Sequence, residues 1–221
     1  MITKVDAKLE QSLREELADV CHMAYARGLL SGTEGNFSSK ITNDFILVTP
    51  KNSHKGLIKP SEFLIVDING SNISNGKSQP TSELALHLEV YRRRPDVNAV
   101  VHAHPVSAVS FSVAGLGFSI PAIPEIIVLL GEVPTAPYAE PGTEKLAKII
   151  GPYIEKHDAV ILDHHGVVTI GTNILNAYCK LESLEHAAKI LHSAKLLGDI
   201  KQLNKDDVQD LLEQRLKIYN K

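Results

Sequence analysis

Apolar residues recur every three or four positions over several long segments of the chain, which is the pattern of helices that bury one face. In the first segment Leu9, Leu13 and Leu17 share a face, and Gly28 provides a stop. Thr81 opens a second segment, which ends before Pro95. The spacing predicts helices over five stretches, namely residues 6–27, 81–94, 143–150, 174–197 and 206–219.

Short runs of apolar and β-branched residues lie between these helices and have the usual length of strands. The runs cover residues 45–48, 63–66, 99–102, 133–138, 159–162 and 167–170. Strands alternate with helices along part of the chain, but hairpin-like neighbours also occur, as on either side of residues 163–166. We therefore expect an α/β fold of three layers, in which helices flank a mixed, largely antiparallel central sheet.

Length and composition limit the classes of function. The 221 residues are 43% hydrophobic and carry 23 basic and 26 acidic side chains, so the net charge is −3. This balance argues against binding to nucleic acid or to an anionic membrane, both of which need a basic surface. No apolar run approaches the roughly 18 residues of a membrane span, and no repeat or long linker divides residues 1–221, so we expect a single domain. A charged N-terminus and only two cysteines favour a cytoplasmic protein.

Two histidines, His102 and His104, stand at the end of an apolar run that Pro105 terminates. Residues two apart on a strand point to the same side, so both imidazoles can reach one metal ion. For this pair alone, two half-buried histidines that hydrogen-bond within a sheet are the favoured interpretation. A second pair, His164 and His165, also follows an apolar run, and one of the two is expected to join the first pair because adjacent strand residues face opposite ways.

Three histidines around one ion leave a coordination position open, which is the pattern of a catalytic metal site. Structural zinc sites normally use cysteines, and Cys21 and Cys179 lack the spacing for one. His87 lies four residues after Glu83, so the two share a helix face. This spacing could hold a metal, but a role behind the site or in packing is favoured for His87.

Two segments carry the donors that an anion needs. The turn Gly32–Asn36 offers glycine amides and small polar side chains, although turns of this composition are common. Thr81 and Ser82 lie at a predicted helix N-terminus, where free amides and the helix dipole favour an anion. In isolation, Ser82 is more often an ordinary helix cap. Beside an anion site and a metal, Glu83 is a candidate general base.

Five motifs, taken in order, resemble the class II aldolase/adducin family, and within it the L-fuculose-phosphate aldolase branch. They are GTEGNFS at residues 32–38, PTSE at 80–83, AVVHAHP at 99–105, APYAEPGT at 136–143 and LDHHG at 162–166. Each motif is short, but their order and spacing are together specific. The resemblance extends over most of the chain, from Gly28 to about Leu197.

The resemblance implies a zinc-dependent aldolase that cleaves a small phosphorylated ketose, similar to L-fuculose 1-phosphate, into dihydroxyacetone phosphate and an aldehyde through a metal-stabilised enediolate. His102, His104 and His165 match the metal ligands of the family, and Glu83 matches its catalytic glutamate. The positions that match phosphate contacts are Thr33, Gly35, Asn36, Asn52, Thr81 and Ser82. Members of the family form homotetramers with active sites between subunits, and we expect the same assembly here.

The chain departs from the family pattern at two places. Where the fuculose enzymes carry a tyrosine that acts as proton donor in a neighbouring subunit's site, this chain has Glu125, which is our candidate for that catalytic role. Tyr219, near the C-terminus, is a further candidate. After Thr49 and Pro50, Asn52 stands at the position of a family glycine, and asparagine can adopt the left-handed conformation that the glycine would supply.

These departures leave other functions open. A related phosphosugar epimerase, decarboxylase or dehydratase would use the same metal and phosphate site. An adducin-like interaction module without catalysis is a second alternative, and the presence of all three matching histidines and of Glu83 argues against it. A zinc hydrolase ranks last because it needs no anion site.

Overall fold

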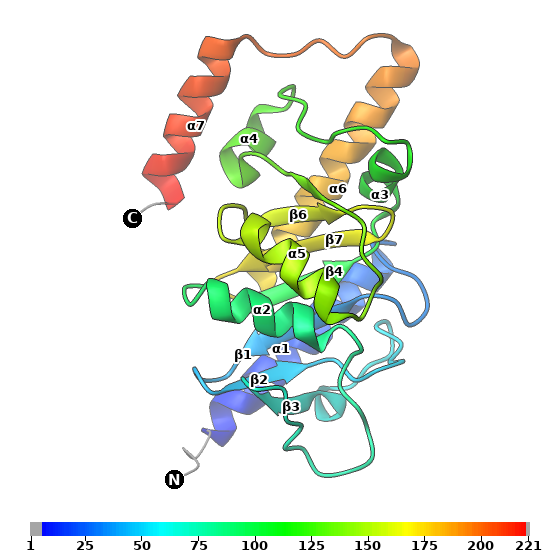
Figure 1. The fold of residues 1–221 in the computed structure, drawn as a ribbon, viewed down its shortest axis with the longest axis vertical. Coiled ribbons are helices and arrows are strands. Elements are labelled where there is room, and N and C mark those ends of the chain that lie inside the picture. Colours follow the sequence, from blue (N-terminus) through cyan, green and yellow to red (C-terminus); the bar gives the residue numbers. More distant parts are fainter. Residues whose placement is uncertain (1–5, 220–221) are drawn as a thin grey trace.

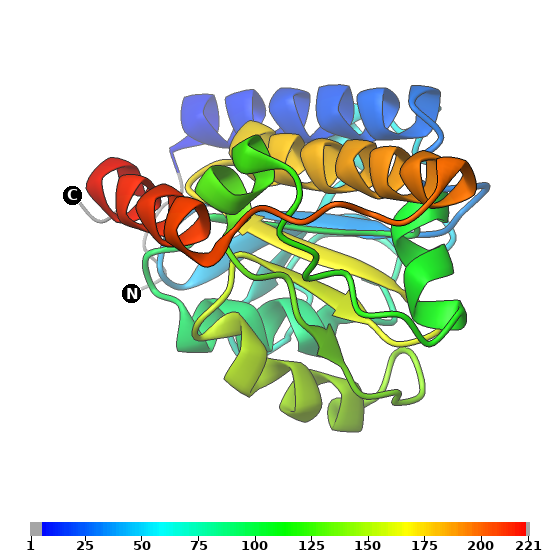
Figure 2. The same cartoon turned by 90° about the horizontal axis from the view of Figure 1, so that it is seen from above.

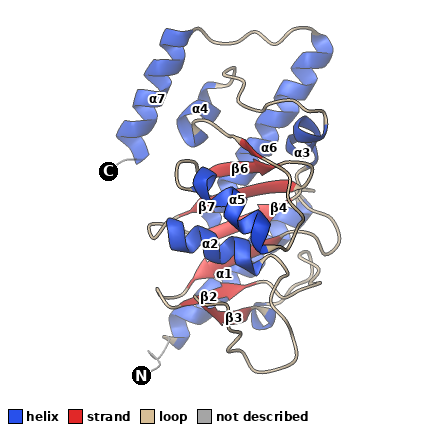
Figure 3. Ribbon diagram, in the orientation of Figure 1, coloured by secondary structure: helices blue, strands red, loops and turns tan. Residues whose placement is uncertain are grey.

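The structure is a computed structural model that describes residues 6–219. Within this range the chain forms seven α-helices, one short 3-10 helix, η1 (Pro60–Glu62), and seven strands (Figure 1 and Figure 3). The helices are α1 (Ala7–Ala26), α2 (Leu84–Arg93), α3 (Val106–Val113), α4 (Pro124–Leu130), α5 (Glu144–Ile154), α6 (Ile174–Leu197) and α7 (Lys205–Tyr219). The strands are β1 (Asn36–Lys40), β2 (Phe45–Val48), β3 (Leu64–Asp67), β4 (Ala99–Ala103), β5 (Thr135–Ala136), β6 (Ala159–Leu162) and β7 (Gly166–Gly171).

The strands form one sheet in the order β3-β2-β1-β4-β7-β6-β5. Every neighbouring pair is antiparallel except β5 and β6, which run parallel. β4 and β7, near the middle of the sheet, are buried along their whole length. The α/β fold with a mixed, largely antiparallel sheet is therefore confirmed.

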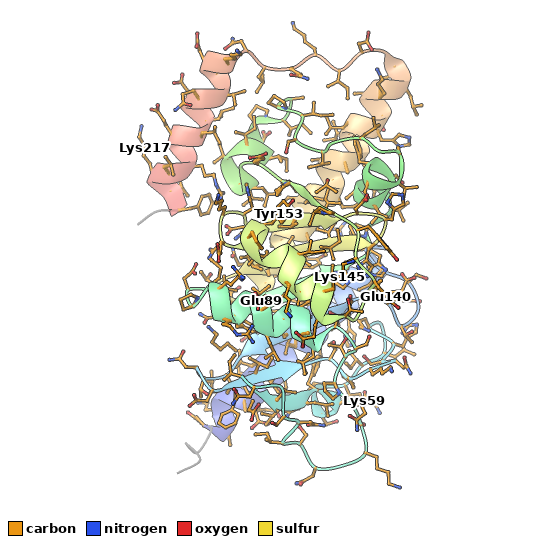
Figure 4. The ribbon with its side chains drawn as sticks, in the orientation of Figure 1. Lys59, Glu89, Glu140, Lys145, Tyr153 and Lys217 are labelled. Carbon is orange, nitrogen blue, oxygen red and sulfur yellow. The ribbon has the colours of Figure 1, made fainter. Side chains whose placement is uncertain are left out.

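Helices cover both faces of this sheet, so the fold has the three expected layers (Figure 2). α1 and α6 lie side by side on one face, where Leu17 and Leu181 are fully buried. α2 and α5 cover the other face and contribute buried residues such as Val90. Figure 4 shows the side chains around these layers, with Glu89 labelled on α2 and Tyr153 on α5. Each face of the sheet therefore has its own apolar cluster.

The predicted helices and strands are in place, with shifted boundaries. α6 spans the expected residues, whereas α2 begins only at Leu84 because residues 81–83 form a turn before it. α5 continues to Ile154. Of the run 133–138 only β5 pairs, since Pro134 and Pro137 flank it and prolines cannot donate to a ladder. Among residues 6–219 no helix combines the length and the apolar character that crossing a membrane requires.

Besides the short η1, the sequence pattern missed three elements, namely β1, α3 and α4. β1 has the sequence NFSSK, which lacks the alternation of a half-buried strand, yet it lies between β2 and β4. α3 and α4 have eight and seven residues and are too short to show a helical period. α4 packs against both α6 and α7, and Arg215 of α7 donates to the Val128 carbonyl oxygen (3.2 Å).

The register of the strands brings several segments to one edge of the sheet. Asn36, at the start of β1, lies opposite His102, and Ala103, at the end of β4, lies opposite Val167. The turn between β6 and β7 is therefore beside the end of β4, and the loop before β1 approaches β4 from the other side (Figure 1). This edge carries both histidine motifs and the turn Gly32–Asn36.

Gly35 determines how closely the loop before β1 approaches β4. Its φ is +69°, and a Cβ added there would lie 2.8 Å from the carbonyl oxygen of His102. Gly32, in the same loop, also has a positive φ of +52°, but an added Cβ would have no atom within 4 Å. Only Gly35 therefore combines left-handed backbone with a close contact to the strand that carries the histidines.

We expect Gly35→Ala to lower the free energy of unfolding more than Gly32→Ala does. In both variants the left-handed backbone strains the new alanine by about 1–2 kcal/mol. Gly35→Ala adds an overlap with the backbone of β4 that costs about 1–3 kcal/mol more. Urea denaturation of the two variants and the parent measures the difference. Equal losses of stability in the two variants would contradict this account of the loop.

Candidate active site

Three imidazole rings meet at this edge of the sheet. His102 is fully buried on β4, His104 follows the end of β4, and His165 lies in the turn between β6 and β7. Their ring centroids are 4.8–5.0 Å apart, and one nitrogen of each ring lies within 4.8 Å of the others. The structure thus brings together the three histidines that the sequence suggested as metal ligands.

The free nitrogens of these rings suit a divalent cation. His102 uses Nδ1 to donate to the Val167 carbonyl oxygen (3.1 Å), which leaves a lone pair on Nε2. That Nε2 lies 3.1 Å from Nε2 of His104, close to the separation of about 3.3 Å between two nitrogens that each bind tetrahedral zinc at ~2.0–2.1 Å. A backbone carbonyl that fixes a ring in this way is a common feature around metal-binding histidines.

Burial keeps the rings of His104 and His165 neutral, which is the form that binds a metal. It lowers the pKa of His104 to about 3 and that of His165 to about 4, and His102 lowers both further. Nδ1 of His165 and Oε1 of Glu83 are buried without a hydrogen-bond partner among the described residues. Orphaned polar atoms of this kind call for a ligand, and the donor set fits zinc or another transition metal.

His164 does not join the cluster. Its backbone has a φ of +56°, and its exposed side chain hydrogen-bonds to Asp163 (2.9 Å). The expectation that one histidine of the pair joins His102 and His104 is confirmed, but its stated reason is wrong. Residues 163–165 form a turn, so the choice of His165 follows from the turn conformation and not from strand alternation.

Glu83 is the buried carboxylate of the site and stands directly before α2. Its Oε2 accepts a hydrogen bond from Nδ2 of Asn36 (2.8 Å) and lies 3.0 Å from Nε2 of His102, while Oε1 lies 3.6 Å from Nε2 of His165. Burial on its own raises the pKa of Glu83, but His102 and the hydrogen bond from Asn36 outweigh it and leave the pKa below its ordinary value. Glu83 is therefore ionised, with one oxygen held and the other free.

These groups open onto one cavity of about 210 Å³. All six positions expected to contact phosphate line it, as do Glu83, His104 and His165: the six are Thr33, Gly35, Asn36, Asn52, Thr81 and Ser82. The expected left-handed conformation of Asn52 is confirmed by its φ of 59°. The side chain of Asn36 already bonds to Glu83, so one N–H of its amide is left for a ligand.

Two residues that the sequence reasoning missed also lie at this cavity. Lys55 is only 2% exposed and donates from Nζ to the carbonyl oxygens of Thr33 (2.8 Å) and Ser53 (2.9 Å). Burial lowers its pKa to about 8, although Cys21 and Glu34 act in the opposite direction. The signal was the basic loop after Pro50, of which the sequence pattern singled out only Asn52.

Glu34 is the second missed residue. Its Oε2 lies 3.5 Å from Nδ1 of His104, and its side chain is about half exposed at the cavity. It stands inside the turn Gly32–Asn36, whose glycines and small polar side chains predicted an anion site. Nothing in that pattern indicates a role for a carboxylate. The cavity therefore carries a carboxylate at its entrance as well as the buried one.

The two candidate proton donors lie elsewhere. Glu125 is in the first turn of α4 and lines a separate groove of about 660 Å³ with Arg27 and His186. Tyr219 ends α7, where the guanidinium of Arg215 lies 5.2 Å from the centre of its ring. Neither residue lines the cavity of the histidines within this chain. Their expected action in a neighbouring subunit involves a second copy and stays a prediction.

Comparison with known proteins agrees with this arrangement. The model of the "Class II Aldolase and Adducin N-terminal domain" family matches residues 15–192. An L-fuculose phosphate aldolase of Methanococcus vannielii is 38% identical over 178 residues, which are 80% of this chain and 94% of that protein. A 3-oxo-tetronate 4-phosphate decarboxylase of Escherichia coli K12 is 33% identical over 211 residues, which are 93% of this chain and 97% of that protein.

A solved structure has a similar fold over most of this chain. The crystal structure of YgbL from Escherichia coli, described as a candidate aldolase/epimerase/decarboxylase, is similar with a TM-score of 0.84 at 31% identity and covers 92% of this chain and 99% of that one. The matched residues 15–192 include all three histidines and Glu83. The resemblance seen in the five motifs is confirmed, and the chain belongs to the class II aldolase and adducin family.

Proposed function

We propose that the protein is a zinc-dependent lyase that cleaves a small phosphorylated ketose into dihydroxyacetone phosphate and an aldehyde. The observation that carries the proposal is the meeting of three imidazoles, a buried ionised carboxylate and a ring of anion donors around one cavity. Relatives named as aldolases and as a decarboxylase all act on sugar phosphates by name, which supports the substrate class.

The phosphate of the substrate binds to the loops of the cavity. The residues that supply donors are Thr33, Gly35, Asn36, Asn52, Thr81 and Ser82, and the start of α2 adds its dipole. Lys55 contributes a buried positive charge beside these loops. This charge stabilises a bound phosphate more than a surface charge does, because solvent screens it less. Holding the phosphate there fixes the reacting carbons near Glu83.

His102, His104 and His165 would hold the metal, and the second and third of these line the cavity. A divalent cation bound there supplies Lewis acidity that stabilises the negative charge left on the ketone side when the carbon–carbon bond breaks. Glu83 exchanges the proton: in the direction of synthesis, its Oε1 accepts a proton from the hydroxymethyl carbon of dihydroxyacetone phosphate. Its Oε2 stays bonded to Asn36.

Decarboxylation of a related keto acid is the second candidate, because it leaves charge on the same carbon and would use the same site. Its support is the 3-oxo-tetronate 4-phosphate decarboxylase of Escherichia coli K12, which is 33% identical to this chain.

We propose a homotetramer with sites at subunit interfaces, in which Glu125 reaches a neighbouring site as proton donor. The family relationship is the support for this assembly.

Product analysis tests the function directly. We expect purified protein to release dihydroxyacetone phosphate from at least one member of a panel that includes the 1-phosphates of L-fuculose, ribulose and 5-deoxyribulose. The same preparation is offered 3-oxo-tetronate 4-phosphate, and carbon dioxide is measured. Carbon dioxide release without any ketose cleavage would replace the aldolase with the decarboxylase.

Two substitutions separate the metal from the base. His104→Ala removes one of three ligands, so we expect loss of bound metal together with loss of turnover. Glu83→Gln keeps the three imidazoles, so we expect normal metal content but turnover lower by about 100-fold or more, since general-base catalysis contributes roughly 10²–10⁴-fold. Elemental analysis and steady-state kinetics on both variants provide the measurements. Full turnover by either variant contradicts the assignment.

Lys55 and Lys51 form a matched pair for testing phosphate binding, because both line the cavity but Lys55 is buried and Lys51 is exposed to solvent. We expect Lys55→Met to raise KM by about 10-fold or more, as a hydrogen bond to a charged group contributes about 1.5–3 kcal/mol. Lys51→Met should change KM by less than about fivefold, since exposed charge pairs contribute about 0–1 kcal/mol. Equal KM values in the two variants, with both proteins folded, would count against a phosphate role for Lys55.

A further inference from the structure

A row of polar side chains crosses the apolar layer between β1 and α2, behind the cavity. Ser38 and His87 are fully buried, and Tyr91 is 4% exposed. Their neighbours on this face are apolar residues such as Val90 and Val100. Buried polar groups are costly unless they are hydrogen-bonded, so the partners of these three side chains explain their presence.

The hydrogen bonds link the row to the catalytic carboxylate. Oγ of Ser38 lies 2.8 Å from the Tyr91 hydroxyl and 2.7 Å from Nδ1 of His87. Nε2 of His87 lies 2.6 Å from Oδ1 of Asn36, and Nδ2 of Asn36 donates to Oε2 of Glu83 over 2.8 Å. Four hydrogen bonds therefore connect Tyr91, at the far end, with Glu83.

The carboxylate fixes the direction of every bond in this row. An ionised carboxylate only accepts, so the NH₂ group of Asn36 faces Glu83 and its oxygen faces His87. His87 must then carry its proton on Nε2, and its Nδ1 accepts from the Ser38 hydroxyl. That hydroxyl in turn accepts from Tyr91. Each donor thus points toward Glu83.

This direction requires a neutral His87 ring, since a protonated ring could not accept from Ser38. Burial lowers the pKa of His87 to about 3, and the nearby His102 lowers it further, while Glu83 acts in the opposite direction. A group with a lowered pKa of this kind is uncharged at neutral pH. The environment therefore supports the tautomer that the geometry demands.

We propose that His87 is a positioning residue for the reaction: through Asn36 it holds Oε2 of Glu83, so that the free Oε1 faces the reacting carbon. The inference rests on the proposed function, in which Glu83 exchanges a proton with the substrate. Oε1 is the buried oxygen without a partner, as the reacting oxygen must be before substrate binds. His87 itself does not line the cavity.

Loss of the donor at His87 acts on turnover and not on binding. Without an N–H directed at its oxygen, the Asn36 amide can rotate by about 180°. Its oxygen then faces the carboxylate of Glu83, and the two groups repel each other. Oε2 is then released and Oε1 loses its orientation, and a misplacement of about 1 Å can cost about 10²-fold in rate. Of the phosphate donors only Asn36 is affected, and Lys55 and the five other positions remain in place, so KM stays close to its original value.

His87→Gln and His87→Asn form a matched pair that tests this role. Both place an uncharged amide in the core, but the longer glutamine side chain carries its NH₂ group to the position of Nε2, whereas asparagine reaches only the position of Nδ1. We expect His87→Gln to retain kcat within about fivefold of the parent. We expect His87→Asn to lose about 10- to 100-fold in kcat, with KM changed less than about threefold and metal content unchanged.

Proton exchange between dihydroxyacetone phosphate and solvent measures the proton transfer to Glu83 separately from carbon–carbon bond cleavage. In deuterium oxide with dihydroxyacetone phosphate and no aldehyde, the C–H bond at the hydroxymethyl carbon breaks, the proton passes to Oε1 and the electron pair moves toward the ketone oxygen. A deuteron from solvent then returns to the carbon. NMR measures the exchange rate, and we expect it to fall in parallel with kcat in His87→Asn and to be preserved in His87→Gln.

The outcomes separate the positioning role from the function. A parent enzyme that exchanges no proton overturns the proposed function and the positioning role with it. A parent that exchanges, with both variants folded and equal in kcat, overturns only the role of His87, as does a rise in KM at constant kcat. Where His87→Asn fails to fold, His87→Gln decides alone: a folded glutamine variant that has lost more than about 100-fold in exchange rate contradicts the proposal.

Discussion

The burial of an ionised carboxylate next to three imidazole rings is the constraint on which this site depends. Glu83 is 6% exposed, and an unpaired charge in such surroundings costs several kcal/mol. The turn before α2 supplies this carboxylate, and other segments at the same edge of the sheet supply its neighbours. β1 supplies the amide of Asn36, and β4 and the β6–β7 turn supply the imidazoles. A cation held by the imidazoles would complete the balance of charge at this edge.

The antiparallel topology makes this meeting possible. Alternate strand ends face the same edge, so segments far apart in the sequence become neighbours: Asn36 lies opposite His102, and Gly166 follows the turn that carries His165. Gly166 also permits close contact, because a Cβ at that position would lie 2.6 Å from the Ala103 carbonyl oxygen and 2.7 Å from the ring of His104. The positions of the ligands thus follow from the backbone contacts of the strands that carry them.

Much of this arrangement was accessible from the sequence, because long periodic segments such as α6 and apolar runs such as β6 leave a clear signal. The three histidines and Glu83 were accessible through the spacing of their motifs and the family resemblance. β1 was not, since Ser38 and Ser39 are polar and their burial is explained only by partners distant in sequence, His87 and the Asn98 carbonyl. Lys55 was missed for the same reason, as nothing in its local sequence shows that its Nζ bonds to Thr33 and Ser53.

The turn Gly32–Asn36 connects the two parts of the cavity. Lys55 donates to the carbonyl oxygen of Thr33 in this turn, where the anion donors lie, and Glu34 is the next residue. The carboxylate of Glu34 lies 3.5 Å from Nδ1 of His104, whereas Nε2 of the same ring lies 3.1 Å from Nε2 of His102. A carboxylate at the outer nitrogen of an imidazole orients the ring and would make its other nitrogen a better metal ligand. One short turn therefore contributes both to the group of anion donors and to the orientation of the imidazoles.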